Sequence, residues 1–252
     1  MRTITALLIL GYIGFFPDSG SKLAAHSAGL KAPLNFRSAP GASPAAAIPE
    51  QEQTFSVPAD SPRWELQGQA KLAQYQGRKC IFIDGGAASL KDFEMRDGVL
   101  DVDAASPADR GFFGFDFRIA NDGANYEEVY LRQHKSGYPD AIQYTPVFNT
   151  GRNWQIYNGP GFTAAVNIPK GAWFHLRLQV TGAQAKLYVK DMDQPALVMN
   201  DLKTGIQKGQ LALYVLTGET DFTTFEVRTP PDAPWERRLP PLPPDALTPW
   251  SL

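Results

Sequence analysis

The chain is poor in the residues that build metal clusters, disulfides and nucleic-acid interfaces. Among its 252 residues, Cys80 is the single cysteine and histidine occurs three times. One cysteine excludes an internal disulfide and a cysteine metal cluster, and two histidines in the predicted domain, His134 and His175, argue against a multi-histidine zinc site. The net charge is −2 without a basic stripe, so we expect no nucleic-acid partner. The apolar neighbours of Cys80, residues 81–83, predict a buried strand thiol.

Long apolar runs are equally scarce, and the one candidate lies at the start of the chain. Arg2 precedes an apolar run over residues 4–16 that stops at Pro17. A basic residue before a run of this length is typical of a secretory leader, and a buried N-terminal helix is the alternative. We therefore predict a signal peptide over residues 1–20, a secreted or periplasmic protein, and no membrane span in the remainder.

Two low-complexity segments flank the central part of the chain. Residues 21–52 are rich in Ala, Ser, Gly and Pro and are predicted to form a disordered, flexible linker. Residues 230–252 hold eight of the 21 prolines and are predicted to form an extended tail. The predicted folded domain therefore spans residues 53–229.

That central part alternates between apolar and polar residues with a period of two, as half-buried strands do. Phe113, Phe115 and Phe117 alternate with Gly114 and Asp116, and the same rhythm runs through residues 173–180 and 211–215. Glycine-containing turns separate the runs, including a predicted hairpin turn at residues 181–183. The pattern predicts an all-β fold, a two-sheet antiparallel jelly-roll sandwich without a long helix.

Residues 126–158 concentrate the chemically interesting side chains. Five of the nine tyrosines lie here. Strand periodicity places Val129 and Leu131 on one face, while the other face carries Glu128 and the candidates Tyr130, Arg132 and His134. Gln143, Tyr144 and Trp154 follow in neighbouring segments. Aromatic faces pack against sugar rings and oriented polar groups bind hydroxyls, so these six residues are the predicted carbohydrate-binding residues. We expect Glu128 to orient Arg132. An ordinary strand with an exposed Glu128–Arg132 pair is the structural alternative.

Three stretches carry a resemblance to a known family. They read GFFGFDFRIANDGANYEEVYLRQH, WFHLRLQVTGAQAKLYVKD and GQLALYVLTGETDFTTFEV. Over residues 54–228 the chain resembles the concanavalin A-like lectin/glucanase superfamily, which includes laminin G-like domains and 3-keto-disaccharide hydrolase-like domains, and uncharacterised secreted bacterial members look most similar. The resemblance implies a jelly roll with a sheet across which glycans lie. It does not imply catalysis, because binding and hydrolytic members share the scaffold.

Two alternatives to carbohydrate binding remain open at this stage. A glycoside hydrolase acting on a glucan or a modified disaccharide would use Glu128 or Asp116 as base and His134 as acid. The Glu-x-Asp-x-x-Glu strand of retaining glucanases in this superfamily is absent, which argues against that chemistry. A laminin G-like module would instead grip a protein partner, and a flat face in place of a groove would favour it.

No cofactor is indicated by the sequence, although calcium stays open. Asp116, Asn121, Asp122 and Asp140 supply oxygen donors near predicted loops, but they form no recognisable calcium-ligand spacing.

Overall fold

The computed structural model describes residues 52–206 and 208–230. The first strand of this part, β1 (Gln53–Val57), begins at Gln53, and the last, β15 (Phe225–Thr229), ends at Thr229. The predicted signal peptide 1–20, linker 21–52 and tail 230–252 lie outside the described residues, apart from Glu52 and Pro230. Within the described ranges, no helix is both long and apolar enough to cross a membrane.

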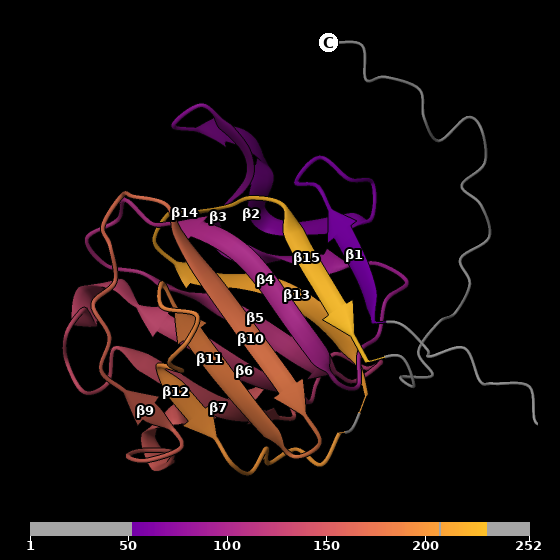
Figure 1. Ribbon diagram of the computed structural model, residues 1–252, viewed down its shortest axis with the longest axis vertical. Helices are drawn as coiled ribbons and strands as arrows, with labels where there is room; N and C mark the ends of the chain where they lie inside the picture. Colours follow the sequence, from indigo (N-terminus) through magenta and orange to yellow (C-terminus); the bar gives the residue numbers. More distant parts are fainter. Residues whose placement is uncertain (1–51, 207, 231–252) are drawn as a thin grey trace, which may run out of the picture. The chain divides into compact units, whose positions relative to one another are not determined.

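The fifteen strands of the described residues belong to one antiparallel hydrogen-bonded sheet, which folds over into two layers (Figure 1). The layer nearer the viewer, called the front layer, follows the order β12-β11-β10-β4, with β14 and β15 beyond β4 and β1 beside β15. Its remaining strands are β4 (Gly98–Ala105), β10 (Phe174–Thr181), β11 (Gln184–Val189), β12 (Leu197–Met199) and β14 (Thr220–Phe222).

The layer behind it, called the back layer, follows the order β3-β13-β5-β6-β7-β8, with β9 also paired to β7. Its strands are β3 (Arg78–Leu90), β5 (Phe112–Ile119), β6 (Tyr126–Arg132), β7 (Ile142–Phe148), β8 (Gly151–Arg152), β9 (Thr163–Ala164) and β13 (Gln210–Thr217). Strand β3 joins the layers, because its first half pairs with β14 and its second half with β13. Strand β2 (Trp64–Tyr75) pairs along the length of β3. The predicted all-β jelly-roll sandwich is confirmed.

The core lies between the layers and is filled by the apolar rows of the alternating strands. Phe113, Phe115 and Phe117 of β5 are at most 1 % exposed. The ring of Phe113 meets that of Phe174 from the front layer at 6.3 Å between centroids. Burying one such side chain stabilises the fold by roughly 1.5–3 kcal/mol, so this row fixes which face of β5 points inward. The opposite face of the back layer points away from this core.

Two smaller predictions about the fold are also confirmed. The hairpin between β10 and β11 turns directly after Thr181, which pairs with Gln184. Cys80 lies in β3, is 1 % exposed, and its thiol donates a hydrogen bond to Oδ1 of Asp221 at 3.2 Å. Burial, followed by the contact with Asp221, raises the pKa of the Cys80 thiol to about 12. The thiol is therefore protonated and chemically quiet at neutral pH.

Candidate functional site

The outer face of the back layer carries the candidate site, and strand periodicity explains which side chains reach it. In β6, Val129 and Leu131 belong to the core, whereas Glu128, Tyr130 and Arg132 point away from it. This is the sorting of faces that the sequence predicts, because successive side chains of a strand point to opposite sides.

The pairing of β5 with β6 brings together residues that the sequence separates. Phe112 at the start of β5 lies opposite Arg132 at the end of β6. The backbone N–H of Gln133 then donates to the carbonyl of Gly111 at 3.0 Å, which ties the chain entering β5 to η1 (Gln133–Lys135), a 3-10 turn. Arg110 therefore reaches the same end of the site as His134 and Lys135.

A hairpin and a second 3-10 turn complete the site from the other side. Strands β7 and β8 are joined through Asn149 and Thr150, whose φ angles of 50° and 65° are those of a tight hairpin turn. The chain continues into η2 (Trp154–Ile156). Nε2 of Gln143, in β7, donates to the carbonyl of Tyr157 at 2.8 Å and holds this turn against the sheet. Trp154 thereby comes to lie beside β6.

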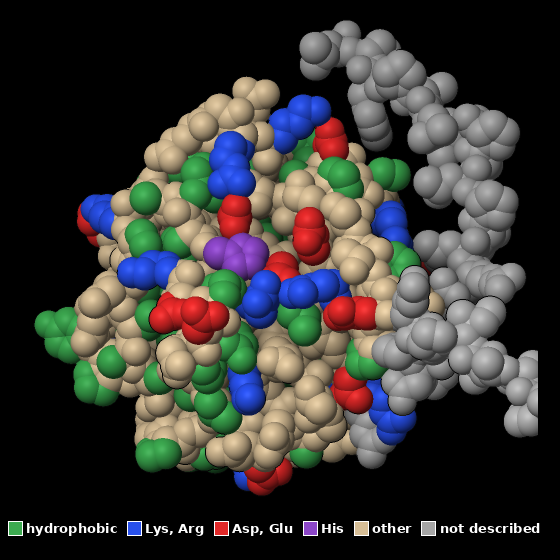
Figure 2. Space-filling view, viewed as in Figure 1, with side chains coloured by type: hydrophobic (Ala, Val, Ile, Leu, Met, Phe, Trp, Pro, Cys, Tyr) green, Lys and Arg blue, Asp and Glu red, His purple; other side chains and the backbone are tan. Residues whose placement is uncertain are grey.

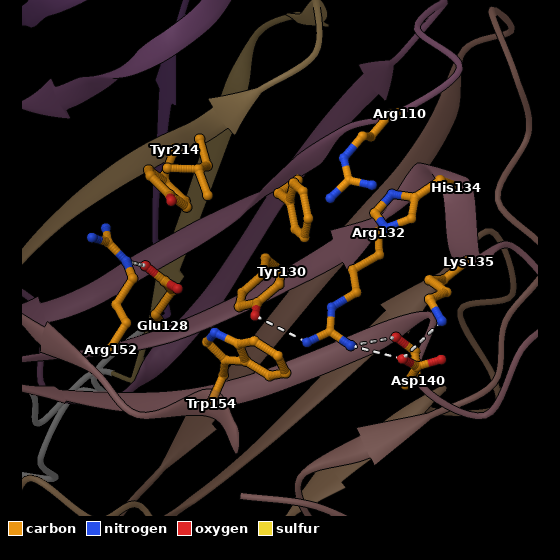
Figure 3. Close-up of a pocket in the computed structure, with 12 residues that line it drawn as sticks. Arg110, Glu128, Tyr130, Arg132, His134, Lys135, Asp140, Arg152, Trp154 and Tyr214 are labelled. Carbon is orange, nitrogen blue, oxygen red and sulfur yellow. Dashed lines mark hydrogen bonds and ion pairs between the residues drawn. The ribbon is translucent and has the colours of Figure 1, made fainter. Parts of the chain in front are cut away.

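These elements enclose a cavity of about 460 Å³, which we call the outer-face cavity (Figure 3). Its lining residues are Arg110, Phe112, Glu128, Tyr130, Arg132, His134, Lys135, Asp140, Arg152, Trp154, Tyr214 and Leu216. The exposed fraction is 42 % for Trp154 but only 6 % for Tyr130 and Arg132. The indole of Trp154 is therefore the large ring of the cavity that is most accessible to a ligand.

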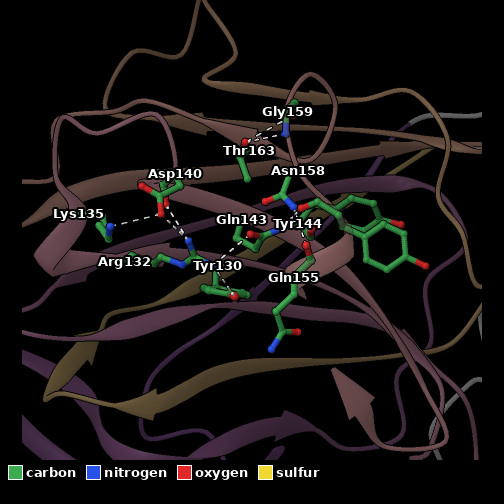
Figure 4. Close-up of polar contacts among 11 residues, drawn as sticks. Tyr130, Arg132, Lys135, Asp140, Gln143, Tyr144, Gln155, Asn158, Gly159 and Thr163 are labelled. Carbon is green, nitrogen blue, oxygen red and sulfur yellow. Dashed lines mark hydrogen bonds and ion pairs between the residues drawn. The ribbon is translucent and has the colours of Figure 1, made fainter. Parts of the chain in front are cut away.

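Arg132 is held rigidly at the centre of this cavity. Its Nη1 donates to the Asp140 carboxylate at 2.9 Å and to the Asp140 carbonyl at 3.3 Å. Its Nη2 donates to Oε1 of Gln143 at 3.0 Å and to the Tyr130 hydroxyl at 3.3 Å (Figure 4). The guanidinium carbon lies 5.3 Å from the ring of Trp154 and 5.5 Å from that of Tyr130. Both terminal nitrogens are thus hydrogen-bonded within the protein. Arg132 therefore contributes positive charge and a fixed surface to the cavity more than N–H groups that a ligand could bind.

Glu128 has a different partner from the one expected. Its Oε2 accepts a hydrogen bond from Nε of Arg152 at 2.7 Å, whereas Arg132 pairs with Asp140. The expectation that Glu128 orients Arg132 is therefore wrong. The two side chains share a face of β6, but Arg152, returning through the β7–β8 hairpin, reaches Glu128, while Asp140 lies at the other end of the strand. The Arg152 guanidinium also lies 4.9 Å from the ring of Tyr214.

Asp116 lies behind Glu128 and does not line the cavity. The two residues lie opposite each other on β5 and β6, so each carboxyl group acts on the pKa of the other. Burial and the neighbouring charge of Glu128 raise the pKa of Asp116 well above its usual range. Burial also raises the pKa of Glu128, although Arg152 opposes that shift. The pair therefore shares a proton more readily than two exposed carboxylates would.

His134 lies at the opposite end of the cavity from Glu128 (Figure 3). Its ring meets that of Phe112 at 5.0 Å between centroids. Burial, and then the charges of Arg110, Lys135 and Arg132, lower the pKa of His134. At neutral pH the imidazole is accordingly uncharged and offers one donor and one acceptor.

The structure brings most of the predicted site residues together, with three exceptions. Tyr130, Arg132, His134, Trp154 and Glu128 all line the outer-face cavity. Gln143 is fully buried beneath Arg132, and Asp116 lies behind Glu128. Tyr144 is a correction.

Tyr144 belongs to the core, so its prediction as a carbohydrate-binding residue is wrong. It is fully buried and follows Gln143 directly in β7, so the two side chains point to opposite faces of the sheet. Its hydroxyl donates to Oε2 of Glu127 at 2.7 Å, and its ring stacks on Phe162.

Sequence reasoning missed seven of the twelve lining residues. For Phe112 and Tyr214 a signal existed, since each alternates with core residues in its strand. On that face of β5 only Asp116 was considered as a site residue, and on that face of β13 none was. Asp140 was considered only as a calcium donor. Arg110, Lys135, Arg152 and Leu216 gave no signal, because their positions depend on how distant segments pair.

The four oxygen donors considered for calcium are not gathered by the fold. Asp116 is buried in β5, Asp140 binds Arg132, and Asp122 caps its own turn by accepting from the backbone of Ala124 at 2.9 Å. In the part of the chain that the structure describes, no group of three or more His, Cys, Asp or Glu side chains is placed to hold a metal ion.

The second histidine of the domain, His175, lies on the outer face of the front layer, away from the outer-face cavity. Nε2 of His175 lies 2.8 Å from Oδ1 of Asp101, and Nδ1 lies 2.7 Å from Oδ1 of Asp103. Asp101 also accepts from Arg177 and Arg228. Figure 2 shows this face, where acidic and basic side chains gather around a histidine.

Comparison with solved structures supports the fold. Over 64 % of this chain and 92 % of the other, it is similar to the carbohydrate-binding module CBM66 from Bacillus subtilis, with 16 % identity and a TM-score of 0.50. A protein of unknown function with a galectin-like fold, also from Bacillus subtilis, matches over 69 % of this chain and 94 % of its own length, with 11 % identity and a TM-score of 0.50.

At these identities the likeness shows the fold alone. Neither the models of known protein families nor the sequences of curated proteins match this chain.

Proposed function

We propose that this domain binds carbohydrate in the outer-face cavity. The observation that carries the proposal is the exposed indole of Trp154 beside the rigidly held guanidinium of Arg132, 5.3 Å from the ring. A flat aromatic face packs against the C–H face of a sugar ring, while neighbouring polar groups bind its hydroxyls.

The polar groups around Trp154 suit a ligand rich in hydroxyls. His134 offers a donor and an acceptor at neutral pH, and the Lys135 ammonium and the outer parts of Asp140 are accessible, with exposed side-chain fractions of 40 % and 37 %. Arg132 and Gln143 keep Tyr130 and the Trp154 turn in place, so the site is formed before the ligand arrives. Preorganisation of this kind lowers the entropic cost of binding.

The shape of the site and the fold favour sugar over a protein partner. A cavity of about 460 Å³ lies within the range of roughly 300–1,000 Å³ that small ligands occupy, whereas protein interfaces are flatter. The similar Bacillus subtilis module of known type is described as carbohydrate-binding. A laminin G-like protein-interaction module is therefore the less favoured alternative.

A hydrolase is also less favoured, for reasons of geometry. Glu128 lines the cavity and has a raised pKa, which is the feature in its favour. Its counterpart on the paired strand, Asp116, is buried and does not line the cavity, whereas a glycosidase needs both of its carboxyl groups to face the scissile bond. His134, with its lowered pKa, is also a poor acid at neutral pH. Turnover of retained glycans that Glu128→Gln abolishes would support the hydrolase.

The proposed setting is outside the cytoplasm, because the sequence predicts a leader over residues 1–20. Sequencing the N-terminus of protein collected from the medium or periplasm tests this. A mature chain that still begins at Met1 would contradict it.

A glycan array with the full chain, with and without calcium, tests the proposal. We expect retention of one glycan class and its loss in Trp154→Ala, with little change in Tm, because Trp154 is 42 % exposed and does not belong to the core. Trp173→Ala is the matched control, since Trp173 lies outside the cavity and packs on Tyr75. No retention of any glycan, or equal loss in both variants, would contradict a sugar site at Trp154.

A further inference from the structure

The charges that line the outer-face cavity are distributed unevenly. At one end, the carboxylate of Glu128 cancels the guanidinium of Arg152. At the other end lie three cations, Arg110, Arg132 and Lys135, with one carboxylate, Asp140, between the last two. Figure 3 shows this separation, with Glu128 and Arg152 on one side and Arg110, His134 and Lys135 on the other. We call the second side the cationic end.

Of the three cations at this end, Arg110 has the fewest contacts with other protein groups. Its side chain is exposed, and its guanidinium carbon lies 5.5 Å from the ring of Phe112. Among residues 52–206 and 208–230, no carboxylate forms an ion pair with it. The neighbouring Asp109 pairs with Lys170 instead. A charged group that packs on an aromatic ring and points at a cavity without a counter-ion is ready for an anionic ligand.

The fold, and not chance proximity, assembles this end. Phe112 lies between Arg110 and His134, contacting the guanidinium of the first and the ring of the second. The Gln133–Gly111 backbone hydrogen bond fixes the two chain segments that carry them. Arg132 is already fully engaged through its terminal nitrogens, so it adds positive potential from below without needing to touch a ligand.

The cations of this end also act on the neighbouring imidazole of His134. After burial, the three causes that lower the pKa of its imidazole are the charges of Arg110, Lys135 and Arg132, and only Asp140 acts in the other direction. A site that disfavours a proton on His134 favours a negative charge beside it.

We infer that the outer-face cavity takes an acidic saccharide, whose anionic group is bound by Arg110 and Lys135 at the cationic end. The inference rests on the proposed carbohydrate-binding function and adds the chemical class of the ligand. The sugar ring packs on Trp154, and the anionic substituent points towards Phe112, where neutral His134 donates or accepts one further hydrogen bond. The carboxylate of a uronic acid and a sulfate ester both meet this description, since both accept charge-assisted hydrogen bonds.

Matched pairs of glycans provide the first test. The full chain is titrated with oligogalacturonate and its carboxyl-reduced neutral form, with oligoglucuronate and its reduced form, and with sulfated galactan and its desulfated form. Preference for the acidic member of a pair supports the inference, and the pair concerned separates carboxylate from sulfate. Equal binding within pairs, or binding of neutral glycans alone on the array, overturns the inference but leaves the proposed function standing. Absence of any glycan binding overturns both.

Variants of the cationic end provide the second test. Arg110→Ala and Lys135→Ala should each weaken binding of the acidic glycan roughly tenfold, with much less effect on a neutral one, because each removes a charge-assisted contact. Lys91→Ala removes an exposed cation outside the cavity and serves as the control. Raising the salt from 0.1 M to 1 M should weaken acidic binding in the parent protein, since the screening length falls from about 10 Å to about 3 Å. Unchanged affinity in both variants overturns the assignment.

Discussion

Oε1 of Gln143 lies 3.0 Å from Nη2 of Arg132, although Gln143 is fully buried and does not line the cavity. The same side chain donates through Nε2 to the carbonyl of Tyr157 and so holds the turn that carries Trp154. One buried amide therefore positions both the central cation and the exposed ring of the candidate site.

Gln143→Leu should consequently weaken glycan binding without removing any ligand contact. The substitution deprives Arg132 of an acceptor and leaves the Tyr157 carbonyl without its donor, so the free energy of unfolding should fall by about 1–3 kcal/mol. Isothermal titration and urea denaturation at 10 °C, where the variant is still folded, separate the two effects. Gln179→Leu, on the front layer, is the matched control. Full affinity in folded Gln143→Leu would show that Arg132 and Trp154 do not need this support.

Tyr144→Phe should lower stability and leave glycan affinity unchanged. The hydroxyl donates to Glu127 at 2.7 Å and accepts from the backbone N–H of Lys203 at 3.0 Å, both on the inner side of the sheet. Its loss leaves buried polar groups without a partner, which costs about 1–3 kcal/mol. Chemical denaturation measures the first effect and titration the second. A variant with parent stability but weakened binding would return Tyr144 to the list of ligand-binding residues.

Asp116→Asn should become more stable relative to the parent protein as the pH rises. The pKa of Asp116 is raised in the folded state by burial and by Glu128, so the folded protein holds its proton more tightly than the unfolded chain does. The parent protein therefore loses stability as the pH rises from the ordinary Asp value, near 3.8, through the folded-state pKa. Asparagine avoids this loss, because it is neutral and can still donate to Glu128.

Urea midpoints of both proteins between pH 4 and 8 measure the difference. Because the titrating groups other than the coupled Asp116–Glu128 pair are common to both, the gap between the two curves reports the titration of that pair. A gap that stays constant across this range would mean that Asp116 titrates normally.

Asp101→Asn should show the opposite dependence on pH. Burial alone would raise the pKa of Asp101, but hydrogen bonds from Arg177, His175 and Arg228 outweigh it and lower the pKa. The stability that the carboxylate contributes is therefore present above its ordinary value of 3.8 and is lost as the pH falls through the lower folded-state value.

At pH 7 we expect Asp101→Asn to cost roughly 3–5 kcal/mol, since it removes the shared partner of several cations. The gap from the parent protein should narrow as the pH falls below the ordinary Asp value of 3.8. Denaturation midpoints at pH 3 and pH 7 check this, and an equal deficit at both would contradict it. Asp60→Asn, which removes only an exposed ion pair with Lys79, should cost little.

The alternation of residues was enough to predict the two-layered all-β fold and the face on which the residues of β6 and most residues of β5 and β10 lie. In β5 and β10 every second side chain is apolar. Burying that row against the other layer fixes which face of each strand points towards the core. The same argument placed Tyr130 and Arg132 together on one outer face, and it could have added Phe112 and Tyr214. The alternation also places the neighbouring residues Gln143 and Tyr144 on opposite faces of the sheet. Predicting both as residues of one site was therefore inconsistent with it.

Only the tertiary structure decided which charges meet. Whether Arg132 pairs with Glu128 or Asp140 depends on where the chain returns after β6 and β7, and Arg110 reaches His134 only because β5 and β6 pair in one register. The face to which a strand side chain points alternates from one residue to the next, so the local sequence determines it. An ion pair or a cavity depends on distances between segments far apart in the chain, which the packing of the two layers and the turns between strands set together.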